Sequence, residues 1–221
     1  MAFAIMVAVI CVYGLLAERQ CKALTEAGAG SKEAVLRKFP KDCKRRIYVA
    51  LGTLLNLGLM SLSFFYYQDR MIYALKLAMV LEWLLIVAFV DFYTGLIPNS
   101  LILQGLLGAL AYMALEIIAA SYPAVISLKD YFFGLLLGGG VFALSAVISR
   151  GSIGMGDIKL FAVLGLMLGI SVVFGLLFFT IFISALAGLL VLLLKKGDKR
   201  TMMPLGPFTC AGMTVVLMMG M

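Results

Sequence analysis

Two aspartates stand at the ends of long apolar runs, where a carboxyl group is unusual. Asp91 follows the apolar run 71–90, and Asp157 directly precedes the apolar run 158–169. An ionisable side chain at membrane depth is costly, which makes both residues candidates for function. Two further apolar runs separate them, so a chain that crosses a membrane and returns would bring both carboxyls to the same side.

A pair of neighbouring carboxyls can hydrolyse an amide bond. Two such groups in close apposition do not readily ionise together, so one keeps a proton while the other stays anionic. The anionic member can take a proton from water, and the neutral member can donate one to the scissile carbonyl oxygen. The spacing of Asp91 and Asp157 therefore suggests a peptidase site, provided that their helices pack together.

The composition excludes several other hydrolytic sites. The 221 residues include no histidine, which rules out serine–histidine and cysteine–histidine schemes and a zinc site of the HExxH kind. The four cysteines, Cys11, Cys21, Cys43 and Cys210, are scattered and form no CxxC pair. We therefore expect neither a disulfide framework nor a metal ligand set, and no cofactor.

The residues around the two aspartates suggest an unusual backbone. Gly154 and Gly156 would allow close approach and a positive φ just before the run that follows Asp157. Pro98 breaks a helix and should leave extended backbone after Asp91, where an extended peptide could pair with it. Taken singly, each aspartate also has an ordinary interpretation, since Asp157 suits a helix N-cap and Asp91 a solvated loop.

The elements that must position these residues are membrane helices. The chain is 64% hydrophobic and 13% charged, with a mean hydropathy of +1.12, whereas soluble domains are about 45–50% apolar and about 25% charged. Long apolar runs match the length of a membrane-spanning helix, about 20 residues. We predict an all-α integral membrane bundle of eight spans, with six to eight as the range, at 1–17, 47–67, 71–90, 100–119, 131–149, 158–169, 170–194 and 208–220. Run 1–17 lacks a basic start and a cleavage site, so we interpret it as a retained span rather than a signal peptide.

The basic residues predict the orientation. Segment 18–46 carries nine Lys and Arg against four acidic residues, and segment 195–200 is also basic, whereas the alternate connections, at 69–70 and 129–130, are balanced. Because positive connections stay in the cytoplasm, the N-terminus is expected outside and both aspartates on the cytoplasmic side. Topology accounts for most of the net charge of +7, so no nucleic acid partner is expected. We divide the chain into residues 1–70, two spans with the short basic loop, and the embedded core 71–221.

Three segments together resemble the type IV prepilin peptidases, a family of GxGD membrane aspartyl peptidases. The segments read DFYTGLIPN at 91–99, GMGDIKL at 154–160 and MPLGPF at 203–208. The resemblance implies an aspartic endopeptidase of a prokaryotic plasma membrane that removes the basic leader of prepilins or pseudopilins. It also implies that Asp91 and Asp157 are the catalytic pair and that Gly154 and Gly156 shape the site. It suggests substrate-binding or positioning roles for Pro98, Asn99 and Lys159, for which a turn and a headgroup contact are the ordinary alternatives.

One departure from the family concerns its second activity. Larger members carry a cytoplasmic domain with two CxxC pairs that binds zinc, and they also methylate the new N-terminus. Segment 18–46 offers only Cys21 and Cys43, too few for a four-ligand zinc site, so we expect a short form without N-methyltransferase activity. Two alternatives remain open: another GxGD peptidase, preflagellin- or presenilin-like, or a proton- or cation-coupled transporter that would use Glu82 with the two aspartates.

The remaining polar residues are expected to be structural. Lys76, five residues inside its span, should snorkel outward, and Glu116 should reach the interface. Glu82 lies nine positions before Asp91, about half a turn out of phase on a helix, so it should face away from the site. Two GxxxG spacings favour close helix packing within the bundle over dimerisation: Gly134 with Gly138, and Gly165 with Gly169.

Overall fold

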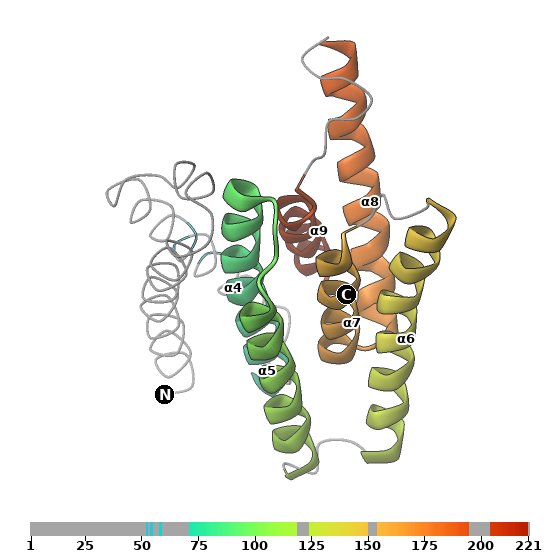
Figure 1. Ribbon diagram of the computed structural model, residues 1–221. Coiled ribbons are helices and arrows are strands. Elements are labelled where there is room, and N and C mark those ends of the chain that lie inside the picture. The colour runs from blue at the N-terminus through green and yellow to red at the C-terminus, as the bar shows by residue number, and fades with distance from the viewer. Residues whose placement is uncertain are drawn as a thin grey trace, which may run out of the picture.

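The computed structural model describes residues 71–118, 124–149, 154–194 and 204–220, together with single positions 52, 54 and 58. These four ranges form helices and contain no strand (Figure 1). The predicted spans at 1–17 and 47–67, the basic segments 18–46 and 195–200, Met203 and the cysteines Cys11, Cys21 and Cys43 lie outside the described residues. The helices are α4 (Met71–Thr94), α5 (Asn99–Ile118), α6 (Ala124–Ile148), α7 (Met155–Leu168), α8 (Ile170–Leu193) and α9 (Gly206–Met218).

The helices follow the predicted apolar runs closely and confirm an all-α membrane protein. Stretches of α4, α6 and α8 are long and apolar enough to cross a membrane: Lys76–Thr94, Leu128–Ile148 and Ile170–Leu193. The count of eight spans is supported only in part, because the described residues form six helices. Two predicted ends were wrong. Helix α4 continues through Asp91 to Thr94, and α6 begins at Ala124, so the pair at 129–130 lies inside a helix rather than in a connection.

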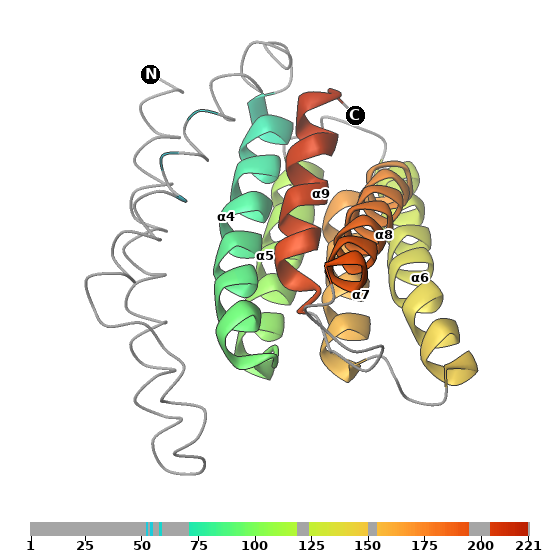
Figure 2. The ribbon, with the colours of Figure 1, turned by 90° about the horizontal axis from the view of Figure 1, so that it is seen from above.

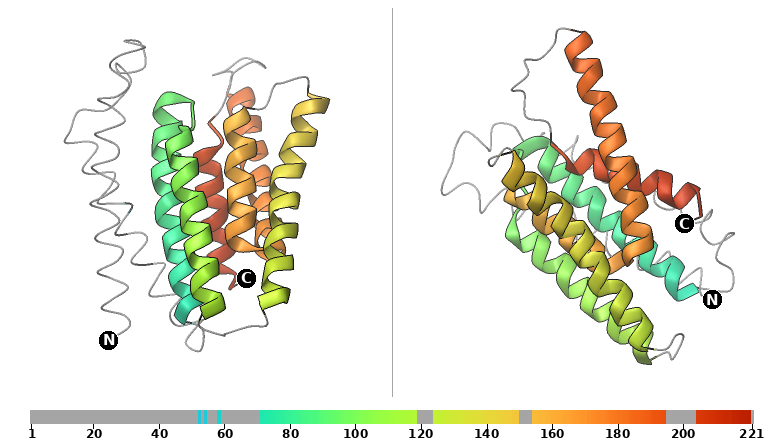
Figure 3. Two further views of the ribbon diagram at one scale, coloured as in Figure 1. Left: turned by 60° about the horizontal axis from the view of Figure 1, so that its bottom comes forward. Right: turned by 90° about the vertical axis from the view of Figure 1, so that its right-hand side faces the viewer.

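The described helices pack side by side as a closed bundle (Figures 2 and 3). Helix α9 packs between α4 and α8, while α7 packs between α5 and α6 and also touches α4 and α8. Helix α4 in turn contacts α5, which completes the ring. This arrangement places the end of α4 and the beginnings of α7 and α9, which are far apart in sequence, within one region of the molecule.

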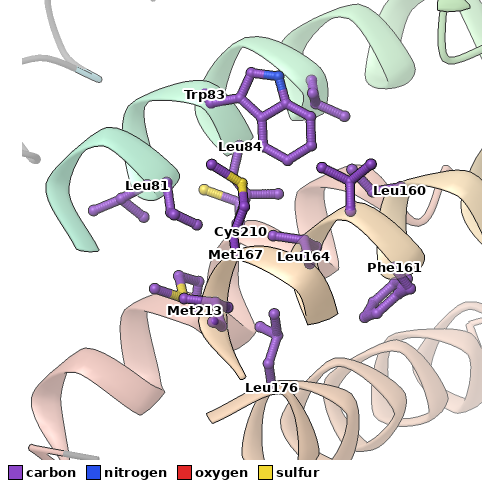
Figure 4. Packing of buried hydrophobic residues seen from close by; sticks show 14 of the residues in the cluster. Leu81, Trp83, Leu84, Leu160, Phe161, Leu164, Met167, Leu176, Cys210 and Met213 are labelled. Atoms are coloured by element: carbon purple, nitrogen blue, oxygen red, sulfur yellow. The ribbon is translucent and has the colours of Figure 1, made fainter. Parts of the chain in front are cut away.

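The core takes side chains from all six described helices, most of them from α4, α7, α8 and α9. Figure 4 shows Leu81 and Leu84 of α4 facing Leu164 of α7, with Leu176 of α8 and Met213 of α9 nearby. All of these side chains are almost completely buried. The interior of the bundle is therefore apolar, and polar groups that lie inside it need specific partners.

Trp83 fixes the packing of α4 on α5. Its indole nitrogen donates a hydrogen bond to the Leu101 carbonyl at 3.0 Å, which satisfies its one donor. The ring lies over Gly105, where any side chain would collide with it. A tryptophan on one helix and a glycine on the other thus let α4 and α5 approach closely.

Glycines bring α6 and α7 into backbone contact, which confirms the predicted close packing. A side chain at Gly134 would collide with the Gly165 carbonyl, and one at Gly138 would collide with the Phe161 carbonyl. Gly169 has a different role. Its φ of 79° lets α7 turn directly into α8, where the Asp130 carboxylate accepts a hydrogen bond from the Ile170 N–H at 3.2 Å.

The expectation that Lys76 snorkels outward was wrong, because the side chain is only 4% exposed. Its ammonium nitrogen lies 4.6 to 5.1 Å from the ring centroids of Tyr73, Tyr112 and Tyr131. It also donates to the Tyr131 hydroxyl at 3.3 Å, and that hydroxyl donates to the Glu116 carboxylate. Aromatic faces and a hydroxyl therefore surround the ammonium inside the bundle, in place of the polar surroundings that outward snorkelling would reach. Glu116 is bound to Tyr131 as well.

Candidate active site

The backbone around Asp91 ends one helix and starts the next. Gly95, with φ of 65°, donates its N–H to the Asp91 carbonyl at 2.7 Å, which is a left-handed glycine cap on α4. Three residues later the Pro98 carbonyl accepts the Leu101 N–H at 3.1 Å, so α5 begins at Asn99. The connection between the two helices is therefore only residues 95–98.

This connection offers less backbone for an extended peptide than the sequence predicts. The Leu96 N–H donates to the Thr94 hydroxyl at 3.1 Å, and the Leu96 carbonyl lies 2.9 Å from the same oxygen. The Leu96 N–H therefore has a local partner, while the carbonyls of Leu96 and Val90 compete for the one proton of the Thr94 hydroxyl. The prediction of strand pairing at this point is not supported for Leu96.

The side chain of Asp91 is directed into the bundle. It is 4% exposed, and one of its carboxylate oxygens accepts the Gly206 N–H at 2.7 Å. Gly206 is the first residue of α9, so a helix N-terminus faces the carboxylate. The positive end of that helix favours an anion, which offsets the unfavourable position of Asp91 in the last turn of α4.

Asp157 lies in the first turn of α7, three residues after the N-cap, so the interpretation of Asp157 as the N-cap was wrong. Gly154 occupies the N-cap position with extended backbone, φ −66° and ψ 139°. The predicted positive φ at Gly154 and Gly156 was wrong, since the positive values in the described ranges occur at Gly95, Gly169 and Gly220. Their role in close approach is supported. A Cβ on Gly154 would lie 3.3 Å from the Asp157 carboxylate, and a Cβ on Gly156 would lie 3.2 Å from the Cβ of Ile97.

The two carboxyls influence each other electrostatically. Asp157 precedes the apolar part of α7 and lies outside the three candidate spans. Burial, and secondly the charge of Asp91, raise the pKa of Asp157 to about 6. The negative charge of one carboxyl therefore makes ionisation of the other less favourable. The folded chain thus brings together the two aspartates singled out in the sequence.

Two contacts join the segments that carry the aspartates. The Lys159 ammonium donates to the Asn99 side-chain oxygen at 3.0 Å, and Gly156 packs against Ile97. Lys159, Asn99 and Gly156 therefore hold the start of α7 against the connection between α4 and α5. Pro98 contributes the start of α5. Ile97 had no assigned role in the sequence, because a partly buried isoleucine in a connection carries no signal of its own.

Glu82, the other acidic residue of α4, does not belong to the site formed by the two aspartates. Glu82 is 4% exposed, within electrostatic range of Cys210 on α9, and about 14 Å from Asp91 along the axis of α4. That distance is too large for the two carboxyls to share a proton. Within the ranges that the structure describes, no three His, Cys, Asp or Glu residues gather as a metal site would require.

Comparison with known proteins gives two findings. The model of the type IV leader peptidase family matches residues 78–193, which include both aspartates. A "Prepilin leader peptidase/N-methyltransferase" of Bacillus subtilis (strain 168) is 34% identical over 141 residues, or 62% of this chain and 52% of the relative. The chain thus spans about half the length of this curated relative. No solved structure matches the present chain.

Proposed function

This chain belongs to the type IV leader peptidase family, and on that premise we propose that it is a membrane aspartic endopeptidase of prepilin or pseudopilin precursors. The observation that supports the proposal is that Asp91 and Asp157, at the ends of two helices in contact, lie within electrostatic range of each other. Family membership favours a peptidase over a transporter.

The pair can perform the hydrolysis with a single water molecule. The ionised carboxyl takes a proton from water while its oxygen attacks the scissile carbonyl carbon, and the neutral carboxyl donates its proton to the carbonyl oxygen. As the tetrahedral intermediate collapses, the carbonyl reforms, the carbon–nitrogen bond breaks and the leaving amine gains a proton. The pair ends with one proton, as it began.

The charge distribution suggests how substrate and enzyme meet. Segments 18–46 and 195–200 are basic, and we place them with the two aspartates on the cytoplasmic side. A precursor with a basic leader and an apolar helix obeys the same rule, so its leader would lie on that side. The bond to be cut must leave the helical conformation, because helical peptide bonds are shielded by their own hydrogen bonds. We propose peptidase activity alone, without methylation of the product.

Substitution of each aspartate tests the assignment. Asp91→Asn and Asp157→Asn should each abolish cleavage of a co-expressed prepilin, because either change removes a carboxyl that must hold or lose a proton. An immunoblot of precursor and mature pilin gives the readout, with membrane insertion of each variant checked by fractionation. Glu82→Gln is the matched control and should retain cleavage. Mature pilin made by either aspartate variant would remove that residue from the catalytic pair.

A further inference from the structure

Gly206 begins the last helix at the point where that helix meets Asp91. Its N–H donates to the carboxylate at 2.7 Å, and the backbone of Leu205 also contacts it. The next residue, Pro207, has no N–H to offer. The carboxylate thus lies against the backbone donors at the start of α9, in a buried position where each hydrogen bond has a large effect.

A Cβ at position 206 would be tighter than ordinary contact, so its neighbours would have to give by a few tenths of an ångström. A Cβ at position 206 would lie 3.0 Å from both the Cβ and the carboxylate oxygen of Asp91, and 3.1 Å from the Ala88 Cα. Two of these atoms belong to backbone or to the root of a side chain, and they cannot move without shifting α4. Helix α9 would have to withdraw, which would lengthen the hydrogen bond.

We propose that Gly206 is a positioning residue whose backbone N–H holds the Asp91 carboxylate in place and keeps Asp91 the anionic member of the catalytic pair. The inference rests on the proposed function, in which the two aspartates share one proton. Asp91 then takes the proton from water, and Asp157 supplies the proton to the scissile carbonyl.

The neighbouring charged and titratable groups are consistent with this division. Asp157, on α7, has a hydrogen bond to the backbone of Gly154 and interacts electrostatically with Asp91. The Lys159 ammonium is bound to Asn99, and Cys210 on α9 lies one turn beyond Gly206, towards Glu82. The described groups around Asp91 thus include no cation that substitutes for the N–H of Gly206.

Replacing a single amide with an ester tests the role of this N–H. Glycolic acid at position 206 of the full chain removes the N–H and keeps the shape, and the α-hydroxy analogue of valine at Val216, in the same helix, is the control. Isotope-edited infrared spectra, with Asp91→Asn as the reference, follow the carboxylate signal of Asp91 against pH. We expect the Gly206 ester to raise the titration midpoint of the Asp91 carboxylate signal by about one pH unit. We also expect it to lower kcat about tenfold. An unchanged midpoint would overturn the proposal.

A conventional pair of variants gives a second measurement. Gly206→Ala should lower kcat at least as much as the ester and move the acidic limb of the pH profile upward. Gly188→Ala on α8, where an added Cβ meets no atom within 4 Å, should change neither. A Gly206→Ala enzyme with the wild-type pH profile would count against the proposal. The infrared midpoint does not depend on turnover, so it also distinguishes failure of this inference from failure of the proposed peptidase activity.

Discussion

Gly156→Ala should impair catalysis while leaving the fold intact, because the added methyl group presses on the connection after Asp91. The new Cβ would lie 3.2 Å from the Cβ of Ile97, closer than the 3.4 Å at which ordinary contact begins, so Ile97 must yield by a few tenths of an ångström. A misplacement of about 1 Å can cost about 100-fold in rate. A shift of about 0.3 Å therefore corresponds to about a fourfold loss in kcat.

The effect on stability should be small, because two terms oppose each other. Alanine gains about 0.5–1 kcal/mol over glycine within a helix, while an overpacked contact costs about 1–3 kcal/mol. The net destabilisation should therefore lie between about 0 and about 2.5 kcal/mol. Gly140→Ala, where the added Cβ meets no atom within 4 Å, is the matched control and should keep full activity.

The identity of the nearest atom gives a sharper test. Valine at position 97 keeps the Cβ that causes the clash, so Ile97→Val should not rescue Gly156→Ala. Ile97→Gly removes that Cβ and should abolish the additional loss. Initial rates on a purified prepilin are measured for Gly156→Ala, for Ile97→Gly and for the variant that combines them. These rates give the coupling between positions 156 and 97. An equal rate loss from Gly156→Ala in both backgrounds would show that its methyl group acts somewhere other than on Ile97.

Three further predictions follow from the site and its surroundings. Because Asp157, with a pKa of about 6, must carry the proton, kcat should decline as pH rises above about 6 in a pH–rate profile; activity that increases steadily to pH 8 would contradict this assignment. Lys76→Met should lower thermal stability in detergent by about 1–2 kcal/mol, because it removes the cation from the faces of Tyr73, Tyr112 and Tyr131. Cleavage should persist in this variant, since Lys76 lies about 22 Å from Asp91 along α4, and a variant as stable as wild type would contradict the role of the ring contacts. Mature pilin from a host without another prepilin peptidase should carry an unmethylated N-terminus by mass spectrometry, and a methyl increment on its first residue would show that segment 18–46 suffices for methylation.

The local signals in the sequence predicted most of the described helices and that the two aspartates would lie near each other. Apolar length predicts a membrane helix, and short motifs of Gly, Pro and Asp predict where it begins or ends. The same local signals placed the positive φ wrongly at Gly154 and Gly156. Near the two aspartates the left-handed residue is instead Gly95, which ends α4 one turn after Asp91.

The features that the sequence could not predict depend on partners far along the chain. Lys76 is buried because the rings of Tyr112 and Tyr131, which belong to other helices, cover its ammonium. No local sequence pattern predicts that contact. Gly206 stands 115 positions from Asp91. Its segment was recognised from the Gly-Pro pattern, but its hydrogen bond arises only from the packing of α9 on α4. The role of Ile97 likewise follows from the neighbour that Gly156 admits.

The shortness of α7 has a consequence for the surrounding lipid. Its 14 residues span about 21 Å, whereas the hydrocarbon core of a bilayer is about 30 Å thick. Helix α8, with 24 residues, follows after the single residue Gly169 and is about 15 Å longer. Helix α7 alone is therefore shorter than the hydrocarbon core, and a thinner bilayer should bring its first turn, which carries Asp157, closer to bulk water. Acyl-chain length thus becomes a variable that sets how far Asp157 lies from bulk water.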